Sequence, residues 1–390
     1  MELLEKEFPS VSPRTATETL DPELEKGHES VLAVLLERHK NGYRRGIDDD
    51  GRKVGVTFDP GGMAAIVSVA MARKLEVAGL LSCVDGFYGL SAGGLNAAYA
   101  AAGQIKEGTD LYGNIAPDNK LVDFTRMVPG GRPIMDLDVL RMAVTKAHPL
   151  NLDKITGKGV PVVIGITDMD SPNKRGIIVK STDFDHEHKD EFLNKLIMGC
   201  NYPIAAGGPI IGDNGNRHTD GGMAFVSSVE LAVDDGCTHV LSLANTPQPQ
   251  SEKSSFAQKL GASLITRAGQ RYINSNGTSV EVPREERLSR KLRNPLSSIS
   301  NYLLEALTLS GDNRTDWHYN EFSRIAERRR GWPYTLTETF SELRGARVER
   351  IYPPDIPELP GMLAMDKKKL RAGVRGGRLA VRAGLQKSQL

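Results

Sequence analysis

The chain has 390 residues, of which 39% are hydrophobic and 25% charged, and its formal net charge is +1. These values are typical of a globular protein with a sizeable core, and the near-zero charge argues against nucleic acid as a partner. The three cysteines, Cys83, Cys200 and Cys237, are too few and too scattered for a disulfide framework or a zinc site. We therefore expect reduced, buried thiols and no metal.

The amino-terminal region is acidic and contains Pro, Ser and Thr, so we expect a disordered arm over residues 1–20. It lacks the apolar core of a signal peptide. No apolar run in the chain approaches the roughly eighteen residues that a membrane-spanning helix needs. We expect a cytoplasmic protein without an integral membrane segment, which would meet a lipid substrate from the water side.

Strands and helices then alternate along the chain. A helical segment over 21–49 contains a predicted helix from Ser30 to Lys40, with Ser30 as its N-cap. Buried strands are predicted at Val54–Phe58, Val84–Tyr88, Val160–Ile166, Gly176–Val179 and His239–Leu243, with helices at Met63–Ala78 and Leu95–Ala102. This alternation predicts an α/β domain over 50–248, three-layered (α/β/α), with a mostly parallel central sheet covered on both faces.

After residue 248 the pattern changes to helical periodicity, at 255–273, 295–309 and 317–330. The tail from Asp366 is basic, and as a helix it aligns Leu370, Val374, Val381 and Leu385 in one stripe, although its glycines weaken the helix prediction. We predict a helical, basic C-terminal extension over 249–390 that packs on the domain. Its cations either form solvated helix faces or make peripheral contact with an anionic membrane surface.

The most informative local pattern is Gly89-Leu90-Ser91-Ala92-Gly93, between a predicted strand and a predicted helix. In this context G-x-S-x-G is a nucleophile elbow, because the glycines permit a tight turn that exposes the serine oxygen. The helix N-terminus beside Ser91 favours developing negative charge. The structural alternative is that Ser91 only caps the helix.

Two glycine-rich turns supply candidate partners for the serine. The N–H groups of Gly61, Gly62 and Met63 follow the first strand and form a candidate nest for an oxyanion. A phosphate cradle is the alternative, although no G-x-G-x-x-G or Walker lysine follows. The turn Asp220-Gly221-Gly222 carries a carboxylate that acts as a base or, alternatively, only hydrogen-bonds to its own turn.

Together these residues resemble the patatin-like phospholipases of bacteria, which have a glycine-rich oxyanion loop, G-x-S-x-G and D-G-G in this order. The resemblance covers roughly residues 52–245 and includes 131–138, Ile166-Thr167-Asp168 and the stretch from Pro203 to Gly212.

The resemblance implies a serine lipid acyl hydrolase without a cofactor. In it, Ser91 attacks an acyl ester of a phospholipid, lysophospholipid or related lipid, and Asp220 takes the serine proton. The backbone of Gly61, Gly62 and Met63 holds the oxyanion. The glycines that shape the elbow and the aspartate turn are Gly89, Gly93, Gly221 and Gly222.

One loop departs from that pattern. Where the family has G-G-G-x-R/K-G, this chain has Pro60-Gly61-Gly62-Met63-Ala64-Ala65. Pro60 removes a backbone donor and Ala64 replaces the basic residue. Two alternatives therefore stay open: a non-catalytic lipid-binding or membrane-associated pseudoenzyme of the same fold, and a Ser-Asp-His α/β-hydrolase esterase with His239 or His318 as its base.

Overall fold

The computed structural model describes residues 30–118, 121–123, 133–171, 176–207, 209–225, 227–248, 340–361 and 364–388. Within this part of the chain, nine strands form one sheet in the order β5-β6-β3-β2-β1-β7-β9-β8, with β4 paired to β3. The strands are β1 (Val54–Phe58), β2 (Gly86–Gly89), β3 (Val162–Asp168), β4 (Gly176–Lys180), β5 (Ile210–Ile211), β6 (Arg217–Asp220), β7 (His239–Leu243), β8 (Phe340–Leu343) and β9 (Ala346–Ile351). Strands β3, β2, β1, β7 and β9 run parallel, whereas β4 and β6 pair antiparallel with β3, and β8 with β9.

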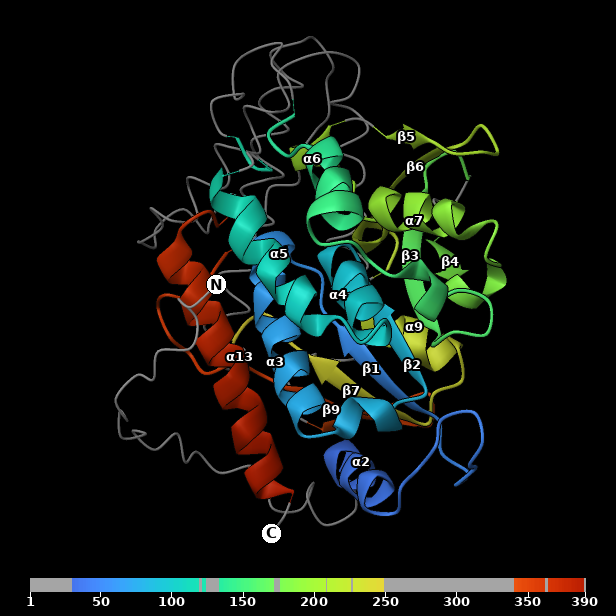
Figure 1. The fold of residues 1–390 in the computed structure, drawn as a ribbon, viewed down its shortest axis with the longest axis vertical. Helices are drawn as coiled ribbons and strands as arrows, with labels where there is room; N and C mark the ends of the chain where they lie inside the picture. The colour runs from blue at the N-terminus through green and yellow to red at the C-terminus, as the bar shows by residue number, and fades with distance from the viewer. Residues whose placement is uncertain are drawn as a thin grey trace, which may run out of the picture.

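Helices cover both faces of this sheet, which confirms the three-layer prediction (Figure 1). The longer helices are α2 (Val31–Lys40), α3 (Ile66–Val77), α4 (Ala92–Ala101), α5 (Ile105–Asp118), α7 (Lys189–Met198), α9 (Ser228–Asp234) and α13 (Lys367–Lys387). The shorter ones are η2 (Gly62–Ala65), η3 (Leu80–Cys83), α6 (Leu137–Met142), η5 (Ala143–Ala147), η6 (Leu152–Lys154), η7 (Ser181–Asp183), α8 (Pro203–Ala206) and η8 (Gly221–Met223). Helices α3 and α4 pack on one face, α9 packs on the other, and α5 and α13 lie outside α3 (Figure 1).

The strand sequences explain why helices cover both faces of the sheet. Every residue of β1 is buried, with Val56 and Phe58 in the core under α3 and α4. On β2, Phe87 joins the same core, while the next residue, Tyr88, packs toward α9. Because successive side chains point to opposite faces, a strand that is apolar at nearly every position needs helices on both sides.

The helices predicted at Ser30–Lys40 and in the basic tail are both present. In α2 the Ser30 hydroxyl accepts a hydrogen bond from the Ala33 N–H at 3.3 Å. In α13 the Asp366 carboxylate accepts one from the Lys368 N–H at 2.7 Å, and the predicted apolar stripe faces the core.

The glycines of α13 have a packing role that the sequence prediction did not recognise. A Cβ on Gly377 would lie 2.3 Å from the Val67 carbonyl oxygen, and one on Gly373 would lie 2.8 Å from Ile66 Cγ2. The missing side chains therefore let α13 approach α3 closely, and this contact compensates for the low helix propensity of glycine.

The segment 340–351 differs from the helical expectation for 249–390. It forms the β8–β9 hairpin, and β9 extends the parallel sheet by pairing with β7, with Val348 opposite Val240. Charged residues interrupt the apolar pattern of β9, yet Glu349 and Arg350 are both buried among polar partners. The helices predicted at 255–273, 295–309 and 317–330, and the arm at 1–20, lie outside the described residues.

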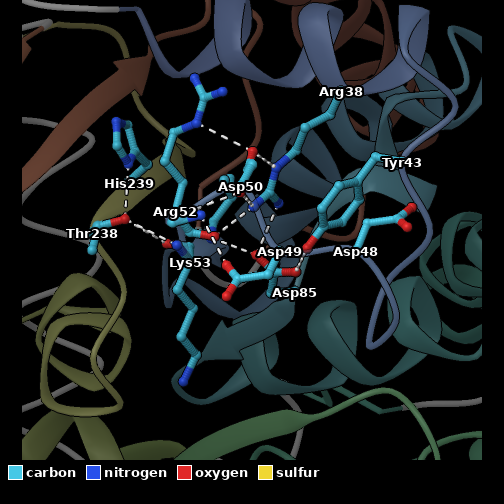
Figure 2. Close-up of polar contacts among 12 residues, drawn as sticks. Arg38, Tyr43, Asp48, Asp49, Asp50, Arg52, Lys53, Asp85, Thr238 and His239 are labelled. Atoms are coloured by element: carbon cyan, nitrogen blue, oxygen red, sulfur yellow. Dashed lines mark hydrogen bonds and ion pairs between the residues drawn. The ribbon is translucent and has the colours of Figure 1, made fainter.

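A polar network closes the amino-terminal edge of the sheet (Figure 2). The buried Arg38 donates to Asp50 at 2.7 and 2.8 Å and to Asp85 at 2.8 Å. Asp85 also accepts hydrogen bonds from the Tyr43 hydroxyl at 2.8 Å and the Val54 N–H at 2.7 Å. The network thus ties α2 to the starts of β1 and β2.

Candidate active site

The predicted elbow is present between β2 and α4. Ser91 has φ 54° and ψ −132°, and only one other non-glycine residue in the described part of the chain has a positive φ. Such a conformation costs on the order of 1–3 kcal/mol and persists where the surroundings impose it. Here the surroundings require glycine on both sides: a Cβ on Gly89 would lie 2.2 Å from the Gly93 carbonyl oxygen, and one on Gly93 would lie 2.4 Å from the Phe58 carbonyl oxygen.

The Ser91 hydroxyl does not cap α4, so the structural alternative for this residue is wrong. The strained backbone directs the serine away from its own helix instead. The Ser91 side chain lowers the pKa of the Asp220 carboxyl group. A Cβ on Gly221 would lie 3.0 Å from Leu90 Cδ2, so the residues next to Ser91 and Asp220 are in contact. The elbow and the D-G-G turn, 129 residues apart in the chain, therefore meet at one point.

Asp220 ends β6 and is 3% exposed. Burial raises its pKa to about 6, against the opposing interactions with Ser91 and the Gly222 N–H. Oxygen Oδ1 accepts the Gly222 N–H at 2.7 Å, which is the turn role given as an alternative, whereas Oδ2 has no hydrogen-bond partner among the described residues. One oxygen thus shapes the turn, and the other makes no hydrogen bond to the described residues.

The surroundings of Asp220 fix its position. The Asp220 N–H donates to the Asn201 carbonyl at 3.0 Å, and the Thr167 hydroxyl donates to the Asp220 carbonyl at 2.8 Å. A Cβ on Gly221 would lie 2.1 Å from the Gly165 carbonyl oxygen, so the first glycine of the turn is required for β6 to lie against β3. Thr167 belongs to the Ile166-Thr167-Asp168 segment that the sequence singled out.

The glycine-rich loop lies beside the elbow, because Gly93 at the start of α4 touches the Phe58 and Asp59 carbonyl groups. Gly62 has φ 53°, and η2 begins there. Among the described residues, no group accepts a hydrogen bond from the N–H groups of Gly61, Gly62 or Met63. The loop therefore presents backbone donors at the start of a helix, which is suited to an anion.

Two buried asparagines hold this loop, and the sequence analysis did not identify them. Asn245 donates from Nδ2 to the Asp59 carbonyl at 2.7 Å and to the Pro60 carbonyl at 3.2 Å. Asn96 donates to the Ala65 carbonyl at 2.8 Å. Asn245 directly follows β7, at the carboxyl edge of the sheet. Functional polar residues of parallel sheets gather at this edge, so the position of Asn245 in the sequence could have identified it as a candidate.

Arg350 supports the same loop from β9. It forms a largely buried ion pair with Asp59, and its Nη1 lies 3.3 Å from the Ser242 hydroxyl. Burial raises the pKa of Asp59, and the arginine opposes this shift. The loop has no basic residue at Ala64, but Arg350 on β9 places a cation beside its first residue, Asp59.

His239 is not placed to act as the base of a triad. His239 begins β7, opposite Val54, whereas the loop and the elbow follow the other end of β1. The two ends of β1 are four residues apart, which corresponds to a distance of roughly 13 Å along an extended strand. The His239 ring lies with Thr238 at the amino-terminal edge (Figure 2). The triad with His239 as base is therefore wrong, and His318 lies outside the described residues.

The remaining polar candidates are consistent with structural roles. His186 and His188 are exposed and pair with Asp153 and Asp185. The described residues include no group of three or more His, Cys, Asp or Glu side chains that could hold a metal ion. Among the described helices, none is long and apolar enough to cross a membrane. The three cysteines are free and buried, as predicted.

No protein-family model and no curated protein matches this chain. Among solved structures, the chain is similar to VipD from Legionella pneumophila, at 12% sequence identity and a TM-score of 0.34, over 71% of this chain and 67% of that chain. This likeness is too distant to assign a function, which must be argued from the residues of the site.

Proposed function

We propose that the protein is a serine hydrolase of acyl esters, with Ser91 as nucleophile and Asp220 as general base. The observation that carries this proposal is the free carboxylate oxygen Asp220 Oδ2, which is buried and has no hydrogen-bond partner among the described residues. Ser91 lowers the pKa of the same carboxyl group. A pKa of about 6 suits a general base near neutral pH, because the group is mostly ionised and still basic enough to take a proton.

The reaction would proceed in two half-reactions. Ser91 Oγ attacks the ester carbonyl carbon as its proton passes to Asp220 Oδ2, and the carbonyl oxygen becomes an oxyanion. The N–H groups of Gly61, Gly62 and Met63 stabilise that charge; each such donor lowers the barrier by about 3 kcal/mol. The carbon–oxygen bond to the alcohol then breaks, and Asp220 returns the proton to the leaving alcohol. Water, deprotonated by Asp220, releases the acyl group and restores Ser91.

The substrate class is inferred from the motif set. Its resemblance to patatin-like phospholipases supports an acyl ester of a phospholipid, a lysophospholipid or a related lipid. The altered loop is compatible with turnover, because the Ala64 N–H closes the turn on the Gly61 carbonyl at 3.0 Å without a basic side chain. Asn245 and Arg350 hold the start of this loop through Asp59.

The test is hydrolysis of short- and medium-chain p-nitrophenyl esters by the wild type, Ser91→Ala and Asp220→Asn, with folding checked by circular dichroism. We expect measurable turnover in the wild type and loss in both variants. Turnover that survives Asp220→Asn would refute the proposed base. No turnover in the wild type would favour the lipid-binding pseudoenzyme. Binding to lipid vesicles would then be measured in place of ester hydrolysis.

A further inference from the structure

Helix α13 carries a row of arginines on the side opposite its packed face. Arg371, Arg375, Arg378 and Arg382 are all exposed, while Gly373, Gly376, Gly377, Ala380 and Val381 are buried. At about 100° per residue, the four arginines lie within about 60° of arc, on a line about 16 Å long. We call these four residues the arginine row.

No acidic side chain in the described part of the chain forms an ion pair with this row. The sequence of α13 contains no Asp or Glu. Among the described residues, none forms an ion pair or hydrogen bond with any of the four guanidinium groups. By contrast, exposed arginines elsewhere pair with a nearby carboxylate, such as Arg44 with Asp48 and Arg217 with Asp170. Considering the described residues alone, the row is therefore a local concentration of positive charge without a paired carboxylate, on a chain whose net charge is only +1.

An exposed apolar side chain lies beside the row, and the row has a fixed orientation. Leu379 is 47% exposed and lies next to the arginines on the helix surface. The buried glycines hold α13 firmly against α3, so the row cannot rotate into the protein. The first half of α13 packs against Ile66, where α3 leaves the glycine-rich loop, and Figure 1 shows α13 running along α3 from that end.

We infer that the arginine row is a docking surface for an anionic lipid bilayer. This inference rests on the proposed function, because an enzyme of lipid esters must reach a substrate held in a membrane. Cations near an anionic leaflet attract it, and an apolar side chain among them can enter the headgroup region. The row would thus hold the molecule at the surface that contains its substrate.

The experiment measures co-sedimentation of the full chain with vesicles of phosphatidylcholine alone and vesicles that contain about one third phosphatidylglycerol. The test variant replaces the four arginines of the row by glutamine, which preserves helix propensity. Each cation contributes about a five-fold factor in binding, so we expect the variant to lose on the order of 100- to 1000-fold in affinity for the anionic vesicles. Added salt should weaken wild-type binding.

A matched control removes the same charge elsewhere, by glutamine at the exposed residues Lys40, Lys146, Lys154 and Lys158. We expect the control to bind anionic vesicles almost as the wild type does. Equal losses in the two variants, or no wild-type binding, would overturn the inference. So would arginine-dependent binding of a short DNA duplex in place of vesicles.

Two further readouts separate this inference from the proposed function. The four-arginine variant should retain hydrolysis of a soluble p-nitrophenyl ester, and Ser91→Ala should retain vesicle binding. Vesicle binding without any ester turnover would contradict the proposed hydrolase and leave the docking surface in place. Loss of soluble-ester turnover in the four-arginine variant would instead assign the row a role in folding and overturn the inference.

Discussion

Arg350 and Asp59 form an ion pair across 291 residues of sequence, with side chains that are only 8% and 14% exposed. Asp59 begins the glycine-rich loop, and Arg350 lies on β9, near the end of the chain. The Arg350 side chain also lies over the Tyr352 ring, with 5.4 Å between the guanidinium carbon and the ring centroid. The last parallel strand of the sheet therefore helps to position the loop that we propose holds the oxyanion.

Arg350→Gln should destabilise the protein by about 3–5 kcal/mol, because it leaves the Asp59 carboxylate buried without its cation. Urea unfolding measures this change. The double variant Arg350→Gln/Asp59→Asn should recover part of the loss, since the uncompensated charge is removed. Arg344→Gln is the control, because that arginine lies in the same hairpin but forms an exposed pair with Asp234. If the changes that Arg350→Gln and Asp59→Asn cause in the free energy of unfolding simply add in the double variant, the two residues are not coupled and this prediction is wrong.

Asp220→Asn should abolish turnover and yet stabilise the folded protein at neutral pH. Burial raises the Asp220 pKa from 3.8 to about 6, so the folded state binds this proton more tightly than the unfolded state. The carboxyl group therefore lowers stability as pH rises through this window, by at most about 3 kcal/mol above it. Asparagine carries no charge to bury and can still accept the Gly222 N–H.

The check is thermal unfolding of the wild type and Asp220→Asn at several pH values. The stability advantage of the variant should be greatest above about pH 6 and should shrink toward pH 4. A variant that is less stable than the wild type at pH 7 would contradict the buried, charged state of Asp220.

Arg38→Gln should destabilise the amino-terminal edge of the sheet. It removes one of the two arginines that pair with Asp50, which keeps its pair with Arg52, and it removes the arginine that pairs with Asp85 (Figure 2). We expect a loss of about 2 kcal/mol, less than for a fully buried pair, because Asp50 is partly solvated. The hydrogen bond from Arg38 lowers the pKa of Asp50, so this stabilisation is present above about pH 4 and is lost on acidification.

Urea unfolding at neutral and acidic pH measures the Arg38 effect. The difference between wild type and variant should narrow at the lower pH. Arg44→Gln, which removes an exposed pair with Asp48, is the matched control and should change stability little at either pH. If Arg38→Gln lost the same stability at both pH values, the contribution of Arg38 would come from its packing and not from its charge.

Gly377→Ala should destabilise the protein by about 1–3 kcal/mol, although alanine favours helix. The added Cβ would lie 2.3 Å from the Val67 carbonyl oxygen, so α13 must move away from α3. Gly113→Ala in α5 is the control, because a Cβ there meets nothing within 4 Å. The control should be neutral or more stable by up to about 1 kcal/mol. Equal effects in thermal unfolding would contradict the close-approach role of Gly377.

The sequence predicted the parts of the fold that local pattern determines. Apolar runs marked β1, β2, β3, β4 and β7, and the elbow glycines marked the strand–turn–helix at Ser91. It did not predict β6, whose residues Arg217-His218-Thr219-Asp220 are polar and are held in the sheet by pairing with β3. It also did not predict β9, where burial of Glu349 and Arg350 depends on partners far away in the chain.

The candidate site divides in the same way. Ser91, Asp220 and the loop glycines belong to short motifs, so their proximity could be proposed in advance. Asn245, Asn96 and Arg350 act through contacts 31 to 291 residues away, for which the sequence has no local pattern. The glycines of α13 were misjudged for the same reason, because their benefit depends on the surface of α3.

The most direct test of the central claim is the rate at which a fluorophosphonate labels Ser91, followed by intact mass and peptide mapping. In the wild type we expect one adduct, on the peptide that contains Ser91, with a rate that rises with pH through about 6 as Asp220 ionises. In Asp220→Asn the adduct should form far more slowly and without that pH dependence. Absence of label at Ser91, or equal rates in the wild type and Asp220→Asn, would contradict a Ser91–Asp220 dyad.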